Sequence, residues 1–417
     1  MPPSRTTIAS IVWMLGASQL IGYGTMYYAF AILAPHVAGD VGWPTVWVFG
    51  SLTLGLFGSG LISTYAGRLV DRHGAARVMA FGSVGAFLSL LGMALAPNGP
   101  AFAAAVVALG LVSPFVQYNA AFTHLAEIAG HDARRRIVHL TLIAGFASTL
   151  FWPLTTQLLH FLSWRGIYVL YAALNLLICL PLHLALRRST RPHAEVIVEE
   201  TALPETAVVV PAHSGDTPLP PHLRRRGLIL VTFGFAVGGF MYSAVLAQMV
   251  PLLTAVGIGT TAVGIAALFG PAQVLVRVVN MLGGAHHHPI ATTLAACALL
   301  VSAVLLLAAA APATIGAIAF VVLFGFGSGL TSIVRGTLPL ALFGRRNYGA
   351  TLGRIASAQL IAASAAPFAL SLLIDTGGTT LALLVLAATG LVGLAAFIAV
   401  TAMLRRERQD AGAVVYG

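Results

Sequence analysis

The stretch Gly67–Met79 reads GRLVDRHGAARVM and separates two long apolar runs. Gly67 permits the close approach of a second helix, and the Asp71 carboxylate can cap or pair with a helix end. Arg72 and Arg77 can bridge to neighbouring helix ends, so the stretch could form a latch that closes in one conformation and opens in the other. The simpler alternative is a solvated turn whose arginines stop transfer through a membrane.

The composition of the whole chain favours a membrane setting. Of its 417 residues, 58% are hydrophobic and 8% are charged, and the mean hydropathy is +0.92. A soluble globular protein carries about 25% charged residues. A bilayer core about 30 Å thick needs roughly 20 apolar residues per helix. Runs of this kind predict twelve spans, at 8–34, 45–66, 78–96, 101–128, 137–162, 166–186, 227–253, 261–283, 289–310, 313–342, 349–374 and 379–404.

The middle of the chain has a different composition. Residues 187–226 contain two arginine clusters, many prolines and five of the twelve acidic residues, and such a segment cannot bury a core. We therefore predict a cytoplasmic linker there, between an N-terminal six-helix bundle at 1–186 and a C-terminal six-helix bundle at 227–404. Residues 405–417 are predicted to form a cytoplasmic tail.

The basic residues predict the orientation. All 22 lysine and arginine positions are arginine, and with both termini in the cytoplasm only Arg165 falls on the opposite side. The net charge of +10 therefore reflects membrane stop signals. A nucleic-acid partner is not expected, because such a protein needs its basic residues on one continuous surface.

A family resemblance rests on the loop quoted above. The loop resembles the signature loop of the major facilitator superfamily, and it lies between the second and third predicted spans, where that superfamily has it. The matching residues are Gly67, Leu69, Asp71, Arg72, Gly74 and Arg77. The resemblance implies two six-helix bundles, a substrate site at the membrane midplane between them, and alternating access by rocking.

A narrower resemblance covers most of the chain. The stretches GYGTMYYAFAILAP at 22–35, GWPTVWVFGSLTLGL at 42–56 and WRGIYVLYAALNLLICLPL at 164–182, with an arginine in the eighth span, are similar to the monocarboxylate porter branch, which includes lactate carriers and oxalate:formate antiporters. The resemblance implies a secondary active transporter, a symporter or antiporter, of a small organic anion. The alternatives are an exporter of drugs or other amphipathic compounds and a non-transporting membrane sensor.

Arg277 is a charge deep in the eighth span, about 24 Å along its helix. A buried arginine needs a partner or a water-filled cavity. In the resembled branch this arginine binds the substrate carboxylate, and a guanidinium matches a carboxylate with two parallel hydrogen bonds. The alternative is permanent pairing within the protein. Gln273 stands one turn earlier, where proton-coupled relatives carry an aspartate, so it is expected to bind the substrate or to hold the Arg277 side chain.

Further candidates could complete a substrate site. Arg335 either lines the cavity, which would favour a dicarboxylate or phosphorylated anion, or extends to the interface. The remaining candidates are polar aromatic or amide side chains in the first and fourth spans, and interface belts also collect tyrosines. They are Tyr23 and Tyr27, expected on one helix face, and Tyr118 and Asn119.

Proton coupling requires a titratable group near the membrane interior, and His124 and Glu127 are the candidates. For Glu127 the simpler alternative is an ion pair with the arginines that follow its span. The triple histidine His286–His288 could bind a metal or sense pH, but adjacent residues in a turn seldom converge on one ion, so no metal site is predicted.

An enzyme is not expected, because the spans contain no recurring pair of catalytic side chains. We expect no cofactor. The partners are then a small organic anion, protons if transport is coupled to them, and the lipid bilayer. The arginine-rich, lysine-free composition suggests a GC-rich bacterial genome, and so a multi-pass protein of the cell inner membrane.

Overall fold

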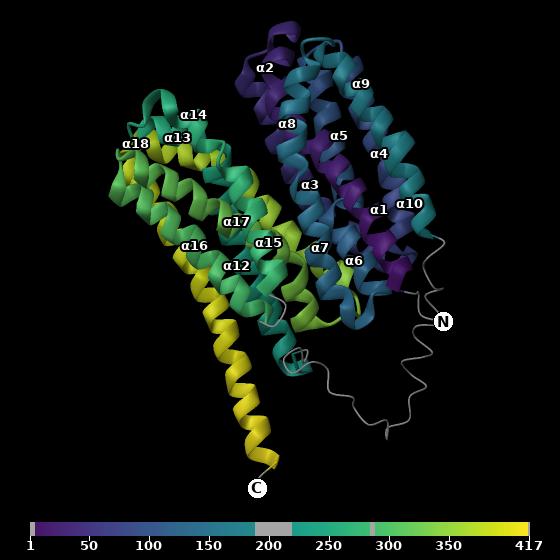
Figure 1. Ribbon diagram of the computed structural model, residues 1–417, viewed down its shortest axis with the longest axis vertical. Coiled ribbons are helices and arrows are strands. Elements are labelled where there is room, and N and C mark those ends of the chain that lie inside the picture. The colour runs from purple at the N-terminus through teal and green to yellow at the C-terminus, as the bar shows by residue number, and fades with distance from the viewer. Residues whose placement is uncertain (1–4, 188–218, 284–287, 416–417) are drawn as a thin grey trace. The chain divides into compact units, whose positions relative to one another are not determined.

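The computed structural model describes residues 5–187, 219–283 and 288–415 (Figure 1). Eleven of the helical segments described there are long and apolar enough to cross a membrane. The last, Tyr348–Glu407, contains two predicted spans, which meet at Gly378, where a φ of 78° interrupts the helix. The predicted all-α membrane fold of twelve helices is confirmed.

The chain forms two compact units, Met1–Thr217 with Gly344–Gly353, and Pro218–Phe343 with Arg354–Gly417. The first unit contains α1 (Arg5–Tyr23), η1 (Gly24–Tyr28), α2 (Ala29–Val41), α3 (Thr45–His73), α4 (Ala75–Leu95), α5 (Gly99–Val116), α6 (Tyr118–Ile128), η2 (Gly130–Asp132), α7 (Ala133–Gly145), α8 (Ala147–Leu158), α9 (Trp164–Leu174), η3 (Asn175–Cys179) and α10 (Leu180–Leu186).

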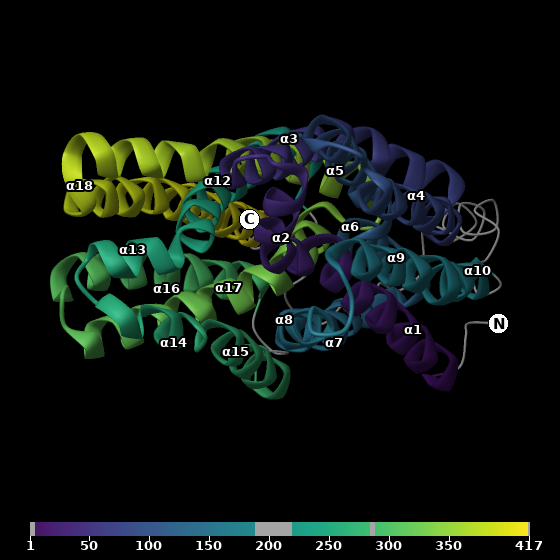
Figure 2. The same cartoon turned by 90° about the horizontal axis from the view of Figure 1, so that it is seen from above.

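The core of the first unit lies where its helices face one another. In both views α4 runs alongside α9 and α10 (Figures 1 and 2), and it contacts them and α5. Leu90, Phe102 and Tyr171 are fully buried there. Helices α3 and α5 approach very closely, since a Cβ added to Gly110 would lie 2.2 Å from the Gly55 carbonyl oxygen. A larger residue than glycine would push these two helices apart.

The second unit contains α12 (Pro221–Ala247), α13 (Met249–Ala255), η5 (Gly259–Thr261), α14 (Ala262–Ala266), α15 (Phe269–Gly283), α16 (Pro289–Ala310), α17 (Thr314–Phe343) and most of α18 (Tyr348–Val415). Helix α17 contacts α15 and α16, and Phe320 and Phe324 on α17 are fully buried in the core. Helix α12 begins at Pro221, which lies inside the segment 187–226 predicted as the linker. Its first turns contain Arg224–Arg226. Helix α18 likewise continues through the predicted tail to Val415.

The surface of the helices is apolar as well as the core. Side chains exposed by more than half include Trp47, Leu61, Phe81, Ile315 and Phe368. In water this would be an aggregation hazard, whereas a helix surface in contact with lipid tails is expected to be apolar.

Several spans are irregular near their middle. Residues 101–128 were predicted as one span, but α5 ends at Val116 and α6 starts at Tyr118, because Pro114 lacks an N–H and Gln117 is extended, with φ −85° and ψ −168°. The first and sixth spans each contain a π-helical turn, η1 and η3. Turns of this kind are frequent at functional sites.

Candidate functional site

Arg277 is the centre of a polar group between α15 and α17. Its side chain is 5% exposed. The Nε atom donates to Ser332 Oγ at 3.1 Å, and Nη2 donates to Gln273 Oε1 at 3.1 Å. Ser332 in turn donates to the Gly329 carbonyl at 2.7 Å. These bonds hold the guanidinium in one orientation.

The two helices can approach because α17 carries glycine where α15 passes. A Cβ added to Gly329 would lie 2.7 Å from the Gln273 carbonyl oxygen. With glycine there, Ser332 reaches Arg277 across the interface. The packing therefore explains how a short serine side chain can serve as a partner of the arginine.

The Arg277 guanidinium is not fully satisfied. Its Nη1 is buried and has no hydrogen-bond partner, and no ion pair involves Arg277 in the part of the chain that the structure describes. Of the two roles predicted for Gln273, the contact with Arg277 is the one seen. A buried cation with a free N–H and no counter-ion can bind an anionic oxygen.

Arg335 lies on α17 three residues after Ser332. It is partly exposed, and its Nε is buried without a partner. Among the described residues, no hydrogen bond or ion pair joins it to the Arg277 group. It stays a separate candidate.

The four predicted substrate residues of the first unit are only partly brought together. The rings of Tyr23 and Tyr118 lie 4.6 Å apart, whereas Tyr27 packs edge-on against Tyr28 at 5.5 Å. Tyr23 and Tyr27 were expected on one face, and the π-helical turn η1, which begins directly after Tyr23, contains Tyr27. Asn119 follows Tyr118 in the first turn of α6.

The signature loop contacts the start of α18, within the first unit. Asp71 accepts hydrogen bonds from the backbone N–H groups of Gly349, at 2.8 Å, and Ala350, at 2.7 Å. A Cβ on Gly67 would lie 2.1 Å from the Gly349 carbonyl oxygen, so only glycine allows this approach. Gly74 has φ +81°, which also suits glycine.

The arginines of the loop differ from the prediction. Arg72 and Arg77 are exposed, and no carboxylate within the described ranges lies within 4.0 Å of either guanidinium. Their predicted bridges to neighbouring helix ends are not seen. The loop is held by its aspartate and its glycines.

The candidate titratable residues lie together at the end of α6. His124 is fully buried, and its Nδ1 lies 3.9 Å from a carboxylate oxygen of Glu127. Neither ring nitrogen of His124 has a hydrogen-bond partner. On α10, His183 is also buried, and it shares a hydrogen bond of 2.8 Å with Ser83. Sequence patterns gave no reason to select His183, because its partners are distant in sequence.

The triple histidine His286–His288 lies mostly outside the described residues. His288 accepts a hydrogen bond from the Ile290 backbone N–H at the start of α16. Among residues that the structure describes, no group of three or more His, Cys, Asp or Glu side chains could hold a metal ion.

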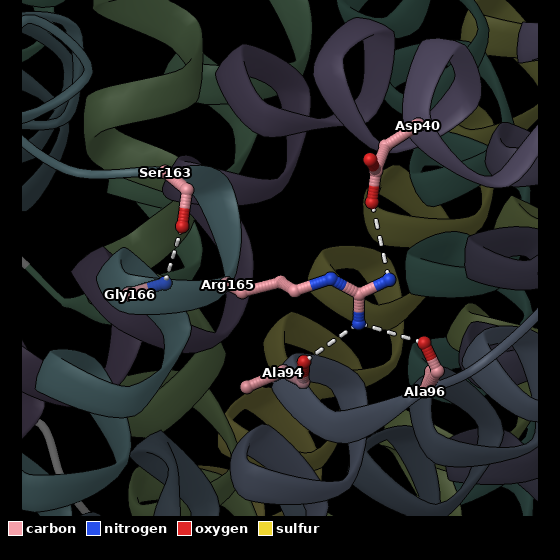
Figure 3. Close-up of polar contacts among 6 residues, drawn as sticks. All are labelled: Asp40, Ala94, Ala96, Ser163, Arg165 and Gly166. Carbon is pink, nitrogen blue, oxygen red and sulfur yellow. Dashed lines mark hydrogen bonds and ion pairs between the residues drawn. The ribbon is translucent and has the colours of Figure 1, made fainter.

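Arg165 belongs to a structural cluster at the end of α4 (Figure 3). One guanidinium nitrogen donates to the carbonyl oxygens of Ala94, at 2.9 Å, and Ala96, at 2.7 Å, and the other lies 3.1 Å from Asp40. The Arg165 Cζ atom lies 4.2 Å from the centroid of the Trp164 ring, over its face. The sequence pattern identified Arg165 only by its side of the membrane.

Comparison with protein families identifies the class to which these features belong. The model of the Major Facilitator Superfamily matches residues 15–367. The chain belongs to this superfamily, and it is a multi-pass secondary transporter and not an enzyme. No curated protein sequence matches the chain significantly.

Solved structures share the fold at low sequence identity. The human organic anion transporter MFSD10 (TETRAN) has a TM-score of 0.72 and 17% identity, with 95% of this chain and 100% of that chain covered. The proton:xylose symporter XylE has a TM-score of 0.68 and 15% identity, over 93% and 94% of the two chains. The transporter FucP has a TM-score of 0.64 and 14% identity, over 93% and 97%. At these identities the likeness concerns the fold alone.

Proposed function

We propose that this protein transports a small, monocarboxylate-like organic anion by alternating access, and that Arg277 binds the substrate carboxylate. The observation that carries the proposal is the buried guanidinium whose Nη1 has no partner. Its Nε atom donates to Ser332 and one N–H of its Nη2 atom donates to Gln273. Burying an arginine in the middle of a membrane helix costs roughly 2.5–3.5 kcal/mol. An anion that binds at Nη1 would neutralise this buried charge.

The resemblance to the monocarboxylate porter branch supports the same substrate class. An arginine in the eighth span is the shared feature, and Gln273 is the departure from proton-coupled relatives. Glutamine does not titrate, so a proton relay at this position is not part of the proposal. If transport is coupled to protons, His124 and Glu127 take that role. We place both termini in the cytoplasm, because all the predicted cytoplasmic segments carry arginine. The lysine-free, arginine-rich composition favours a bacterial inner membrane.

The signature loop is assigned the role of a conformational latch. Asp71 holds the first turn of α18 through two backbone N–H groups, and Gly67 allows the contact. Gly74 gives the turn its shape, while Arg72 and Arg77 remain solvated. Such a contact can break and reform as a unit, since it depends on one carboxylate.

The deciding experiment measures flux through purified protein in liposomes. Labelled carboxylates would be tested for saturable uptake by the wild type and by Arg277→Lys and Arg277→Gln. Lysine keeps the charge but cannot form two parallel hydrogen bonds with a carboxylate, and glutamine has no charge. A fall in uptake of about 100-fold is therefore expected for both variants. Arg354→Lys changes an exposed arginine of the second unit and is the matched control, with uptake near that of the wild type.

Two outcomes would exclude the proposal. An exporter with a permissive apolar cavity would tolerate Arg277→Lys and move neutral amphipathic compounds. A sensor would give no saturable flux with any anion, although the protein is folded and reconstituted.

A further inference from the structure

Two arginine clusters that are far apart in the sequence lie side by side at one end of the second unit. Arg224–Arg226 belong to the first turns of α12, and Arg405–Arg406 lie in the last part of α18. The two helix ends are in contact, since the His222 Nε2 atom on α12 lies 3.6 Å from a carboxylate oxygen of Glu407 on α18.

Apolar packing between α12 and α18 fixes this arrangement. The rings of Phe235 and Phe397 lie 5.2 Å apart, and a Cβ added to Gly227 would lie 3.3 Å from the terminal methyl group of Met403. The contacts follow one another in antiparallel order, so the arginines at the start of α12 and those near the end of α18 lie at the same level. Like charges repel at such a place unless an anion lies among them.

The side chains of the two clusters are exposed and largely unpaired. Arg224 donates to the Phe343 carbonyl oxygen. The Glu407 carboxylate pairs with His222. Four arginines have no hydrogen bond or ion pair with any residue that the structure describes: Arg225, Arg226, Arg405 and Arg406. The patch therefore offers four guanidinium groups to an external anion.

An exposed apolar surface begins directly beside these arginines on both helices. On α12, Arg226, Ile229 and Phe233 lie on one face, and the two apolar side chains are 58% and 47% exposed. On α18, Ile398 is 52% exposed and lies on the same face as Arg405, two turns away. The arginines thus stand at the level where the lipid-facing surface ends and water begins.

We propose that these two arginine clusters bind the phosphate headgroup of an anionic phospholipid, whose acyl chains lie against the exposed apolar faces of α12 and α18. Guanidinium groups match phosphate oxygens with paired hydrogen bonds. A zwitterionic lipid is disfavoured, because its ammonium group would be repelled by the neighbouring arginines. A free phosphate would leave the adjoining apolar surface without a partner, whereas a lipid covers both. The inference does not rest on the proposed function.

The test measures which lipid contacts this surface when the protein is in nanodiscs. Ala402 is exposed on α18 between Ile398 and Arg405, and Ala402→Cys would carry a bimane fluorophore in a chain with Cys179→Ala and Cys297→Ala. Quenching by phosphatidylglycerol with a nitroxide on its acyl chain would be compared with quenching by the matching phosphatidylcholine. A preference for phosphatidylglycerol of about tenfold or more is expected, since each arginine near an anionic headgroup strengthens association by about fivefold. Equal quenching by the two lipids would overturn the inference.

A double variant separates this patch from the net charge of the protein. Arg225→Gln with Arg405→Gln removes one arginine from each cluster, and the preference should fall about tenfold. Arg68→Gln with Arg135→Gln is the matched control, because it removes two exposed arginines of the first unit and should keep the full preference. An unchanged preference in the first variant, or an equal fall in both, would overturn the assigned site.

Two measurements with all arginines present cover the case in which the double variant does not fold. Raising the salt concentration from about 0.05 M to about 0.5 M should lower the preference at least about threefold, because exposed charges are screened. A preference that is independent of salt would show that the acyl chains alone select the lipid, and would overturn the proposal. Excess glycerol 3-phosphate at constant ionic strength should leave the quenching unchanged, whereas displacement of the lipid would identify a site for soluble phosphates and overturn the lipid assignment.

Discussion

Arg165 makes both an ion pair and bonds to backbone carbonyls, and the two kinds of contact differ in energy. The Asp40 and Arg165 side chains are 51% and 36% exposed, and an exposed ion pair contributes about 0–1 kcal/mol. The carbonyl oxygens of Ala94 and Ala96 stand at the end of α4, where a helix has no N–H of its own to offer. The bonds to these carbonyls should therefore contribute more to the stability of the fold than the ion pair does.

Substitutions at the two residues of this ion pair test that ranking. Asp40→Asn should lower the free energy of unfolding by less than about 0.5 kcal/mol, whereas Arg165→Gln should lower it by about 1–3 kcal/mol because two helix-end carbonyls lose their donor. Thermal and denaturant unfolding of the detergent-purified variants, followed by circular dichroism, would measure both. Equal losses would show that the ion pair carries the stability.

The role of a single residue could be predicted from the sequence where that residue is charged and the run around it is apolar. Arg277 is an isolated cation within a long apolar run, and it has no acidic partner among the described residues, which agrees with the absence of acidic residues from neighbouring spans. Ser332 carries no such signal, because serine is common in membrane helices. Its contact with Arg277 depends on Gly329, and hydropathy does not report how closely two helices pack.

The first turn of α18 is held by a side chain from another element. Asp71 satisfies the N–H groups of Gly349 and Ala350, which lack partners within their own helix. A carboxylate at this position also interacts favourably with the positive start of the helix, and the loss of such a cap costs about 0.5–2 kcal/mol.

Asp71→Ala should therefore loosen the start of α18. The amide hydrogens of residues 349 and 350 are expected to exchange with deuterium about tenfold faster than in the wild type, while exchange in the rest of α18 stays unchanged. Mass spectrometry of peptic fragments would measure the rates. Asp132→Asn, which affects an exposed aspartate paired with Arg136, is the control. Unchanged exchange at the start of α18 would argue against the latch.

At the scale of helices, hydropathy predicted the existence of the spans but not their irregularities. The break at Gln117 and the π-helical turns η1 and η3 lie inside runs whose mean hydropathy is that of a single membrane span. Pro114 was a visible signal for the break. The π-helical turns depend on tertiary bonds, such as the one from Asn175 Nδ2 in η3 to Thr25 Oγ1 in η1, across 150 residues of sequence.

The whole molecule joins residues that are far apart in the sequence. Asp71 and Gly349 are separated by 278 positions, and Ser83 and His183 by 100. Family resemblance indicated that the loop would matter, but a motif does not name its partner. The buried His183 belongs to the same class of features, because its partner Ser83 lies on a different helix.

Transport by the whole molecule gives the test of the proposed proton site. His124 is fully buried, neither ring nitrogen has a hydrogen-bond partner, and a Glu127 carboxylate oxygen lies 3.9 Å from Nδ1, so we propose this pair as the place where a coupled proton binds. In liposomes, an imposed pH gradient should drive accumulation of the anion by the wild type. His124→Gln should abolish accumulation yet keep exchange of labelled for unlabelled anion, since exchange needs no net proton movement. His160→Gln changes an exposed histidine and should behave as the wild type. Gradient-driven accumulation in His124→Gln would remove this residue from the coupling mechanism.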